Sequence, residues 1–116
     1  MIFLKIHMVV HPEKQQELLQ TFHTVLSRVR KERGCQNSLL VRDTENETLF
    51  FLLEIWDTKR NLDRHFRSEN FGILLGAANL LSGETEMKCY ALSYTAGEEA
   101  IKAARAKKGL KGAVDE

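Results

Sequence analysis

Three residues whose types suit chemistry lie close together in "LLEIWDTKRNLDRHF", residues 52–66: Glu54, Trp56 and His65. An imidazole titrates near neutral pH, so a histidine beside an apolar pocket can act as a general base. It can equally be a helix histidine that donates to a backbone carbonyl and fills space. A tryptophan at a strand end is more often a core or subunit contact than part of a site. The residue types alone leave both interpretations open.

Glu54 raises a question of charge, because a buried carboxylate needs a partner. Lys5 and Arg42 lie on the strands expected beside it and are the predicted partners. We therefore expect a structural ion pair here rather than a catalytic acid.

The elements that must position these residues follow from hydrophobic periodicity. Residues 2–10 alternate as a strand with one fully apolar face. Apolar residues then recur at three- and four-residue steps, which predicts an amphipathic helix that Pro12 begins and Gly34 ends. Residues 35–43 and 48–57 read as a hairpin around the polar turn "TENE".

Thr58 is suited to cap a second helix, and Ser68 to restart it, before the break at Ser82-Gly83. Residues 85–94 form the last strand. The order β-α-β-β-α-β predicts an α+β, ferredoxin-like domain over residues 1–95, with a four-stranded antiparallel sheet and the helices on one face. Residues 96–116 form a tail, either frayed or a helix that docks on a partner subunit, opened by a capping box of Thr95 and Glu98 and ended by Gly109.

The alternation also assigns the two faces of the sheet. The helices are expected to cover one apolar set: Ile2, Leu4, Ile6, Leu49, Phe51, Leu53 and Ile55. The other face carries a second set, which nothing within the domain is left to cover: Phe3, Val9, Phe50, Leu52 and Trp56. An apolar face of this size favours a homodimer packed sheet to sheet about a twofold axis. On this assignment Glu54 and Trp56 face the partner, whereas His65 faces the helices.

Composition narrows the function classes. Residues 1–95 hold 12 basic and 12 acidic side chains, so the domain offers no long-range field for nucleic acid or a membrane surface. Cys35 and Cys89, with no apparent signal peptide, are expected to be reduced, inert and buried thiols in a cytoplasm. No cysteine or histidine spacing indicates a metal site.

Three segments resemble one known family: "VVHPEKQQELLQTF", "ERGCQNSLLVRD" and "LLEIWDTKRNLDRHFRSENF". They are similar to the antibiotic biosynthesis monooxygenase-like family of dimeric α/β barrels. Glu54, Trp56, Leu62 and His65 fit its Glu-x-Trp strand end and helix histidine, while Asn70 stands where many members carry a second histidine. The family includes cofactor-free oxygenases of aromatic polyketides and quinols, haem degraders, isomerases and members of unknown activity.

The resemblance implies a cofactor-independent monooxygenase of a small aromatic or quinol-like molecule, with His65 as the base and Trp56 as a second candidate catalytic residue. The substrate pocket is expected between the sheet and the second helical region, lined by Ile6, Phe22, Phe51, Phe66, Phe71 and Leu75. An enclosed cavity of roughly a few hundred Å³ beside His65 would favour the enzyme, whereas an interior filled by side chains would argue against the oxygenase.

Two alternatives stay open. A non-catalytic small-molecule-binding or stress-related dimer would have this pocket filled by side chains. Haem binding or degradation is less well supported, because the first strand lacks the asparagine of that branch and Leu75 lies near the position of its iron-binding histidine.

Overall fold

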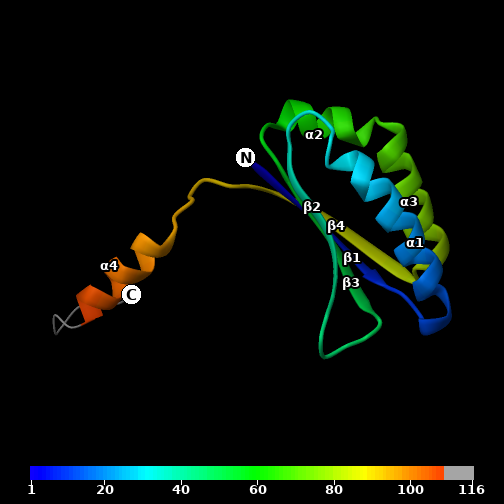
Figure 1. Cartoon of the computed structure of the whole chain (residues 1–116), viewed down its shortest axis with the longest axis horizontal. Coiled ribbons are helices and arrows are strands. Elements are labelled where there is room, and N and C mark those ends of the chain that lie inside the picture. Colours follow the sequence, from blue (N-terminus) through cyan, green and yellow to red (C-terminus); the bar gives the residue numbers. More distant parts are fainter. Residues whose placement is uncertain (109–116) are drawn as a thin grey trace.

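The computed structural model, which describes residues 1–108, is a four-stranded sheet with three helices packed on one face (Figure 1). The strands are β1 (Ile2–Val9), β2 (Cys35–Arg42), β3 (Leu49–Trp56) and β4 (Glu84–Ala91). They lie in the order β2-β3-β1-β4, and every neighbouring pair is antiparallel. The helices are α1 (Pro12–Val29), α2 (Lys59–Phe66), α3 (Glu69–Leu81) and α4 (Glu98–Lys108). The predicted α+β ferredoxin-like class is confirmed.

The two predicted helix starts after β3 are confirmed by their caps. The Thr58 hydroxyl accepts the backbone N–H of Asn61 at 3.1 Å, and the Ser68 hydroxyl accepts that of Phe71 at 3.1 Å. Each cap satisfies an N–H that has no partner within the first helical turn. The second helical region is therefore two helices, α2 and α3, joined at Arg67.

The predicted end of the first helix at Gly34 is wrong. α1 ends at Val29 with Arg30 as its C-cap, and Gly34 lies beyond it in the turn into β2. Gly34 has a φ of 89°, and a Cβ there would lie 2.5 Å from side-chain atoms of Asn61 and Asp57. Glycine is thus required by the backbone conformation and the close approach of α2, rather than by a helix end.

The tail forms a helix, but not at the predicted cap. Residues 92–97 carry no regular structure, and α4 begins at Glu98. The Glu99 carboxylate accepts the N–H of Gly97 at 3.0 Å, so the predicted pairing of Thr95 with Glu98 is wrong. α4 stands apart from the sheet and its helices (Figure 1). The predicted end at Gly109 lies outside the described residues, and docking on a partner stays a prediction.

Strand register corrects the predicted faces. Leu4 lies opposite Glu54 and Ile6 opposite Leu52. Residues directly opposite in an antiparallel pair share a face, so Glu54 and Trp56 lie under the helices and not on the partner side. The buried core accordingly contains residues of β1 and β3, together with Val10 just after β1: Leu4, Ile6, Met8, Phe50, Leu52 and Trp56. Both faces of β3 are largely apolar, so alternation alone did not distinguish them.

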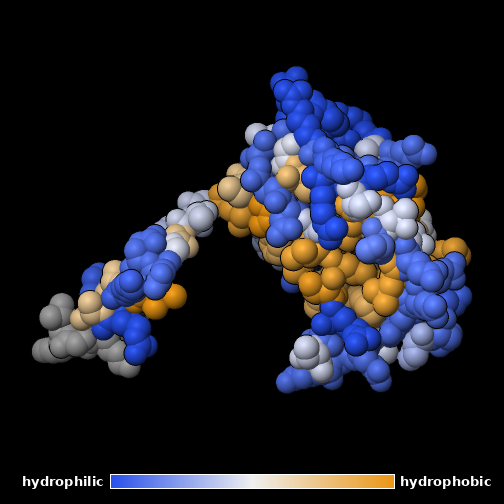
Figure 2. Space-filling model, viewed as in Figure 1, coloured by the Kyte–Doolittle hydropathy of each residue, from blue (hydrophilic) through white to orange (hydrophobic). Residues whose placement is uncertain are grey.

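The opposite side, called here the open face, carries no helix (Figure 1). Its apolar side chains on β1 and β3 are half-buried: Phe3, Val9, Leu49, Phe51, Leu53 and Ile55. Figure 2 shows exposed apolar side chains on the part of the chain that holds the sheet and its helices, and also where the chain leaves β4 toward α4. Leu92 and Tyr94, in the segment between β4 and α4, are 37% and 78% exposed. A large apolar surface therefore remains uncovered in the single chain.

Candidate functional site

The structure brings Glu54, Trp56 and His65 together on the covered face. The rings of Trp56 and His65 stack with centroids 4.5 Å apart and an interplanar angle of 26°. Trp56 reaches this position from the end of β3, and His65 reaches it from the last turn of α2. The predicted separation of Trp56 from His65 is wrong, because it depended on the incorrect face assignment.

Glu54 is satisfied by hydrogen bonds within the core. Its carboxylate accepts the Ser38 hydroxyl at 2.7 Å and the Trp56 indole N–H at 2.9 Å. Ser38 lies directly opposite Glu54 on β2, which places its hydroxyl on the same face. The side chains of Glu54 and His65 are both 0% exposed. Such a carboxylate is stable only because donors replace its water.

The predicted ion pair of Glu54 with Lys5 or Arg42 is wrong. Lys5 lies on the open face, with its Nζ 5.8 Å from the centroid of the Phe51 ring. The guanidinium of Arg42 lies 6.0 Å from the Phe50 ring centroid. The basic group nearest Glu54 among the described residues is instead the imidazole of His65, whose Nε2 lies 3.1 Å from Oε1 of Glu54.

Glu32 is the site residue that the sequence analysis missed. It lies in the turn after α1, and its Oε1 is 2.8 Å from Nδ1 of His65. Its second oxygen accepts the side-chain N–H of Asn70 at 2.7 Å, and its side chain is 18% exposed. No spacing signal links Glu32 to a histidine 33 positions later. Only the packing of α3 against α1, with α2 packed on α3, brings them together.

His65 therefore lies between two carboxylates. Burial acts to lower its pKa, but the contacts with Glu54 and Glu32 outweigh burial and raise the pKa above the ordinary value of 6.5. Nε2 lies near Glu54 without the angles of a formed hydrogen bond, so this contact is mainly electrostatic. The arrangement can stabilise an imidazolium, hold a proton at Nε2 and pass one toward Glu32.

The space beside His65 is filled by aromatic side chains. The Phe71 and Phe66 rings have centroids 5.2 and 6.4 Å from that of His65. Of the predicted pocket lining, three residues are buried in the core and two are half-buried: Ile6, Phe22 and Phe71, then Phe66 and Leu75. Phe51 is a wrong assignment, because it lies on the open face. The predicted enclosed cavity beside His65 is thus occupied by side chains.

The two cysteines lie at different depths. Cys35 is half-buried, and burial followed by the charge of Glu54 raises the pKa of its thiol to about 11. The thiol is therefore protonated and unreactive at neutral pH. Cys89 is exposed, so the expectation that it is buried is wrong.

In residues 1–108, no group of three or more histidine, cysteine, aspartate or glutamate side chains is placed to hold a metal ion. Within the same range, the helices are too short or too polar to cross a bilayer.

Comparison with known proteins gives relatives of the same fold. A curated but uncharacterized Synechocystis protein is 28% identical over 87 residues, which cover 74% of this chain and 59% of that protein. The chain thus matches about six tenths of that relative's length. A conserved Methanosarcina mazei protein of known structure is 28% identical, covers 79% of this chain and 92% of its own, and superimposes with a TM-score of 0.75.

A second solved structure is described as a candidate antibiotic biosynthesis monooxygenase from Deinococcus radiodurans. It has a TM-score of 0.77 at 18% identity and covers 84% of this chain and 97% of its own, so it supports the fold. The family model for antibiotic biosynthesis monooxygenase matches residues 1–72, which include Glu32, Glu54, Trp56 and His65. This chain therefore belongs to the antibiotic biosynthesis monooxygenase family.

Proposed function

We propose that this protein is a cofactor-independent monooxygenase of a small aromatic or quinol-like molecule, with His65 as its base. Family membership supports the reaction class. The observation that carries the proposal is the buried imidazole itself. One nitrogen is held by Glu32 at 2.8 Å, and the other lies 3.1 Å from the Glu54 carboxylate without the angles of a hydrogen bond. A carboxylate that orients an imidazole makes it a stronger base.

The reaction begins with transfer of a phenolic or enolic proton from substrate to Nε2 of His65. The resulting carbanion is electron-rich and passes one electron to oxygen. Recombination forms a peroxide anion, which takes the proton back from the His65 imidazolium. The hydroperoxide then loses water, so that one oxygen atom stays in the product as a carbonyl and the other leaves as water. The substrate supplies the reducing electrons. The protein has to bind the substrate, accept the proton and exclude water.

The neighbouring side chains have defined roles in this scheme. Glu54 stabilises the imidazolium that forms, and Trp56 holds the imidazole plane by stacking on it. Glu32 is partly exposed and connects Nδ1 of His65 to solvent, so it holds the orientation of the imidazole and lets it exchange protons with water between turnovers. Because His65 is fully buried, substrate entry requires Phe66 and Phe71 to move with the α2–α3 corner.

Oxygen uptake with a panel of quinols and polyphenols tests the proposal. We expect His65→Gln to lower kcat by about 10²-fold or more, the usual contribution of a general base. His23→Gln, an exposed histidine on α1, is the matched control and should behave like the native chain. Circular dichroism would first establish that His65→Gln is folded. Unchanged turnover in that variant would leave His65 a structural role only.

A non-catalytic binding protein is the second candidate, and one observation favours it. His65 is 0% exposed, with three aromatic rings packed around it. A site that stays closed would give no oxygen uptake with any substrate on the panel. Retention of quinols without their oxidation, measured by equilibrium dialysis, would support this candidate and contradict the oxygenase.

We also propose that the protein is a homodimer formed through the open face. The half-buried apolar side chains of β1 and β3 on that face support this assembly, because nothing in the described chain covers them. A second copy related by a twofold axis would bury them in a self-complementary interface.

We propose a cytoplasmic location for the protein. Its two free thiols suit the reducing conditions of that compartment.

A further inference from the structure

The chain beyond β4 forms an arm that its own domain does not cover. This C-terminal arm, residues 92–108, consists of an irregular segment followed by α4, and none of its side chains belongs to the buried core of residues 1–108. The radius of gyration of the described chain is 17.9 Å, whereas a compact domain of this length has one of roughly 13 Å. A helix as short as α4 is marginally stable without a surface to pack on. The arm therefore needs a surface that its own domain does not supply.

The C-terminal arm leaves the sheet toward the open face. Its first residue, Leu92, donates its backbone N–H to the carbonyl of Met1 at 2.9 Å, which ties the start of the arm to the residue before β1. Figure 1 shows α4 on the side of the sheet opposite to α1, α2 and α3. Figure 2 shows open space between α4 and the part of the chain that holds the sheet. A second copy packed on the open face would lie in this space.

Apolar side chains continue from the open face onto the C-terminal arm. Tyr90 lies opposite Phe3, and their rings stack with centroids 5.9 Å apart. Together with Leu92 and Tyr94, they line a groove of about 440 Å³ where the arm begins. Ile101 on α4 adds a further apolar side chain, which is 61% exposed. The proposed dimer interface and the arm thus form one continuous surface.

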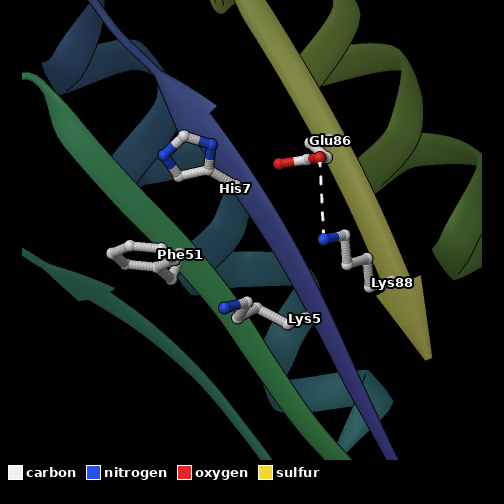
Figure 3. A pocket seen from close by; sticks show the side chains of 5 residues that line it. All are labelled: Lys5, His7, Phe51, Glu86 and Lys88. Atoms are coloured by element: carbon white, nitrogen blue, oxygen red, sulfur yellow. Dashed lines mark ion pairs between the residues drawn. The ribbon is translucent and has the colours of Figure 1, made fainter. Parts of the chain in front are cut away.

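The sheet contact of such a dimer is weakened by charge. Figure 3 shows Lys5, Glu86 and Lys88 on the open face of β1 and β4. Lys5 and Lys88 lie directly opposite each other, and like charges in this position repel. Glu86 lies 3.9 Å from Lys88, a long ion pair between exposed side chains. Burying these charges against a partner is unfavourable, so a stable dimer needs apolar contacts beyond the sheet.

We propose that the C-terminal arm clasps the second copy of the homodimer, with α4 packed on the outside of the partner; this inference rests on the proposed dimer. Packed sheets lie about 10 Å apart, whereas the six residues 92–97 span up to about 20 Å when extended. They are therefore long enough to carry α4 past the edge of the partner's sheet. A helix is about 10 Å wide, so α4 does not fit between two sheets in contact. Leu92 and Tyr94 close the edge of the interface, and Ile101 packs against the partner.

Mixed dimers of the full chain test between which chains the contact forms. Isotope-labelled and unlabelled chains are refolded together, and isotope-filtered NMR detects only contacts between different chains. We expect contacts from the Ile101 methyl groups of one chain to the other chain. Contacts of Ile101 within its own chain only, or with no other residue, would overturn the clasp. A native dimer that lacks these contacts would overturn the clasp alone, whereas a monomeric native chain would overturn both the clasp and the dimer.

A charge on α4 measures what the clasp contributes. Ile101→Asp should raise the dissociation constant of the dimer by about tenfold in sedimentation equilibrium, because it removes an apolar side chain from the contact and places a charge there. Ala103→Asp introduces the same charge on the opposite side of α4 and is the matched control, which should dissociate like the native chain. Circular dichroism would establish that both variants are folded. Equal dissociation constants for the native chain and Ile101→Asp would overturn the clasp.

Discussion

The two faces of the sheet differ in how their charged side chains are compensated. Under the helices, Glu54 and His65 are fully buried, and every partner they use is supplied by this chain. On the open face, Lys5 lies beside a phenylalanine ring and pairs with no carboxylate of residues 1–108. A charge removed from water must be compensated within the fold, whereas a half-exposed charge keeps part of its hydration and needs no partner in the chain.

The largest difference in stability between the two faces is expected from a matched pair of substitutions. Glu54→Gln removes a buried carboxylate opposite an imidazolium, and we expect it to lower the free energy of unfolding by about 3 kcal/mol. Glu86→Gln removes a carboxylate whose side chain is 64% exposed, and its effect should stay within about 0.5 kcal/mol. Urea denaturation measures both. Equal effects would contradict the distinction between the two faces.

Introducing a charge on the open face tests whether a second copy of the chain covers it. The native chain should sediment as a dimer at micromolar concentration, and Leu53→Lys should weaken the dimer by roughly a hundredfold, because it buries an unpaired charge in the interface. Leu80→Lys changes a leucine on α3 that is 74% exposed, and this variant should remain dimeric. A native chain that is monomeric at micromolar concentration would refute the proposed dimer.

The pH dependence of stability tests the covered face. The pKa of His65 is raised in the folded chain, so its stabilising charge is fully present below the ordinary value of 6.5 and is lost as pH rises through the folded pKa. The free energy of unfolding of the native chain should therefore decrease toward alkaline pH. His65→Gln should lack this decrease, and His23→Gln should retain it. Parallel curves for the native chain and His65→Gln would show that His65 contributes no such charge.

The smallest effect on stability is expected from an exposed ion pair whose separation is similar to that of His65 and Glu32. Lys59 and Asp63 lie 2.9 Å apart on α2, almost as close as His65 and Glu32 at 2.8 Å. The Lys59 side chain is 78% exposed, however, so Lys59→Met should change stability by no more than about 0.5 kcal/mol. Thermal unfolding measures this. A loss comparable to that of Glu54→Gln would mean that separation rather than burial controls these interactions.

Local patterns were sufficient for much of the fold. The first helix, the hairpin and the caps at Thr58 and Ser68 each depend on residues within a few positions of one another, and the structure contains all of them. Gly34 shows the limit of such reasoning. Its need for glycine was recognised, but its cause is a turn crowded by residues of and next to α2, more than twenty positions later.

By itself, the sequence determined the order of elements, the family and the three residues at the centre of the covered site. Only the tertiary structure decided that Glu54, Trp56 and His65 share one face, and that Glu32 joins them. Both strand faces of β3 are apolar, so its orientation depends on pairing with β1, on the Ser38 hydroxyl of β2 and on the His65 imidazole of α2. A buried carboxylate takes the face on which these partners meet, and no periodicity within one strand encodes that.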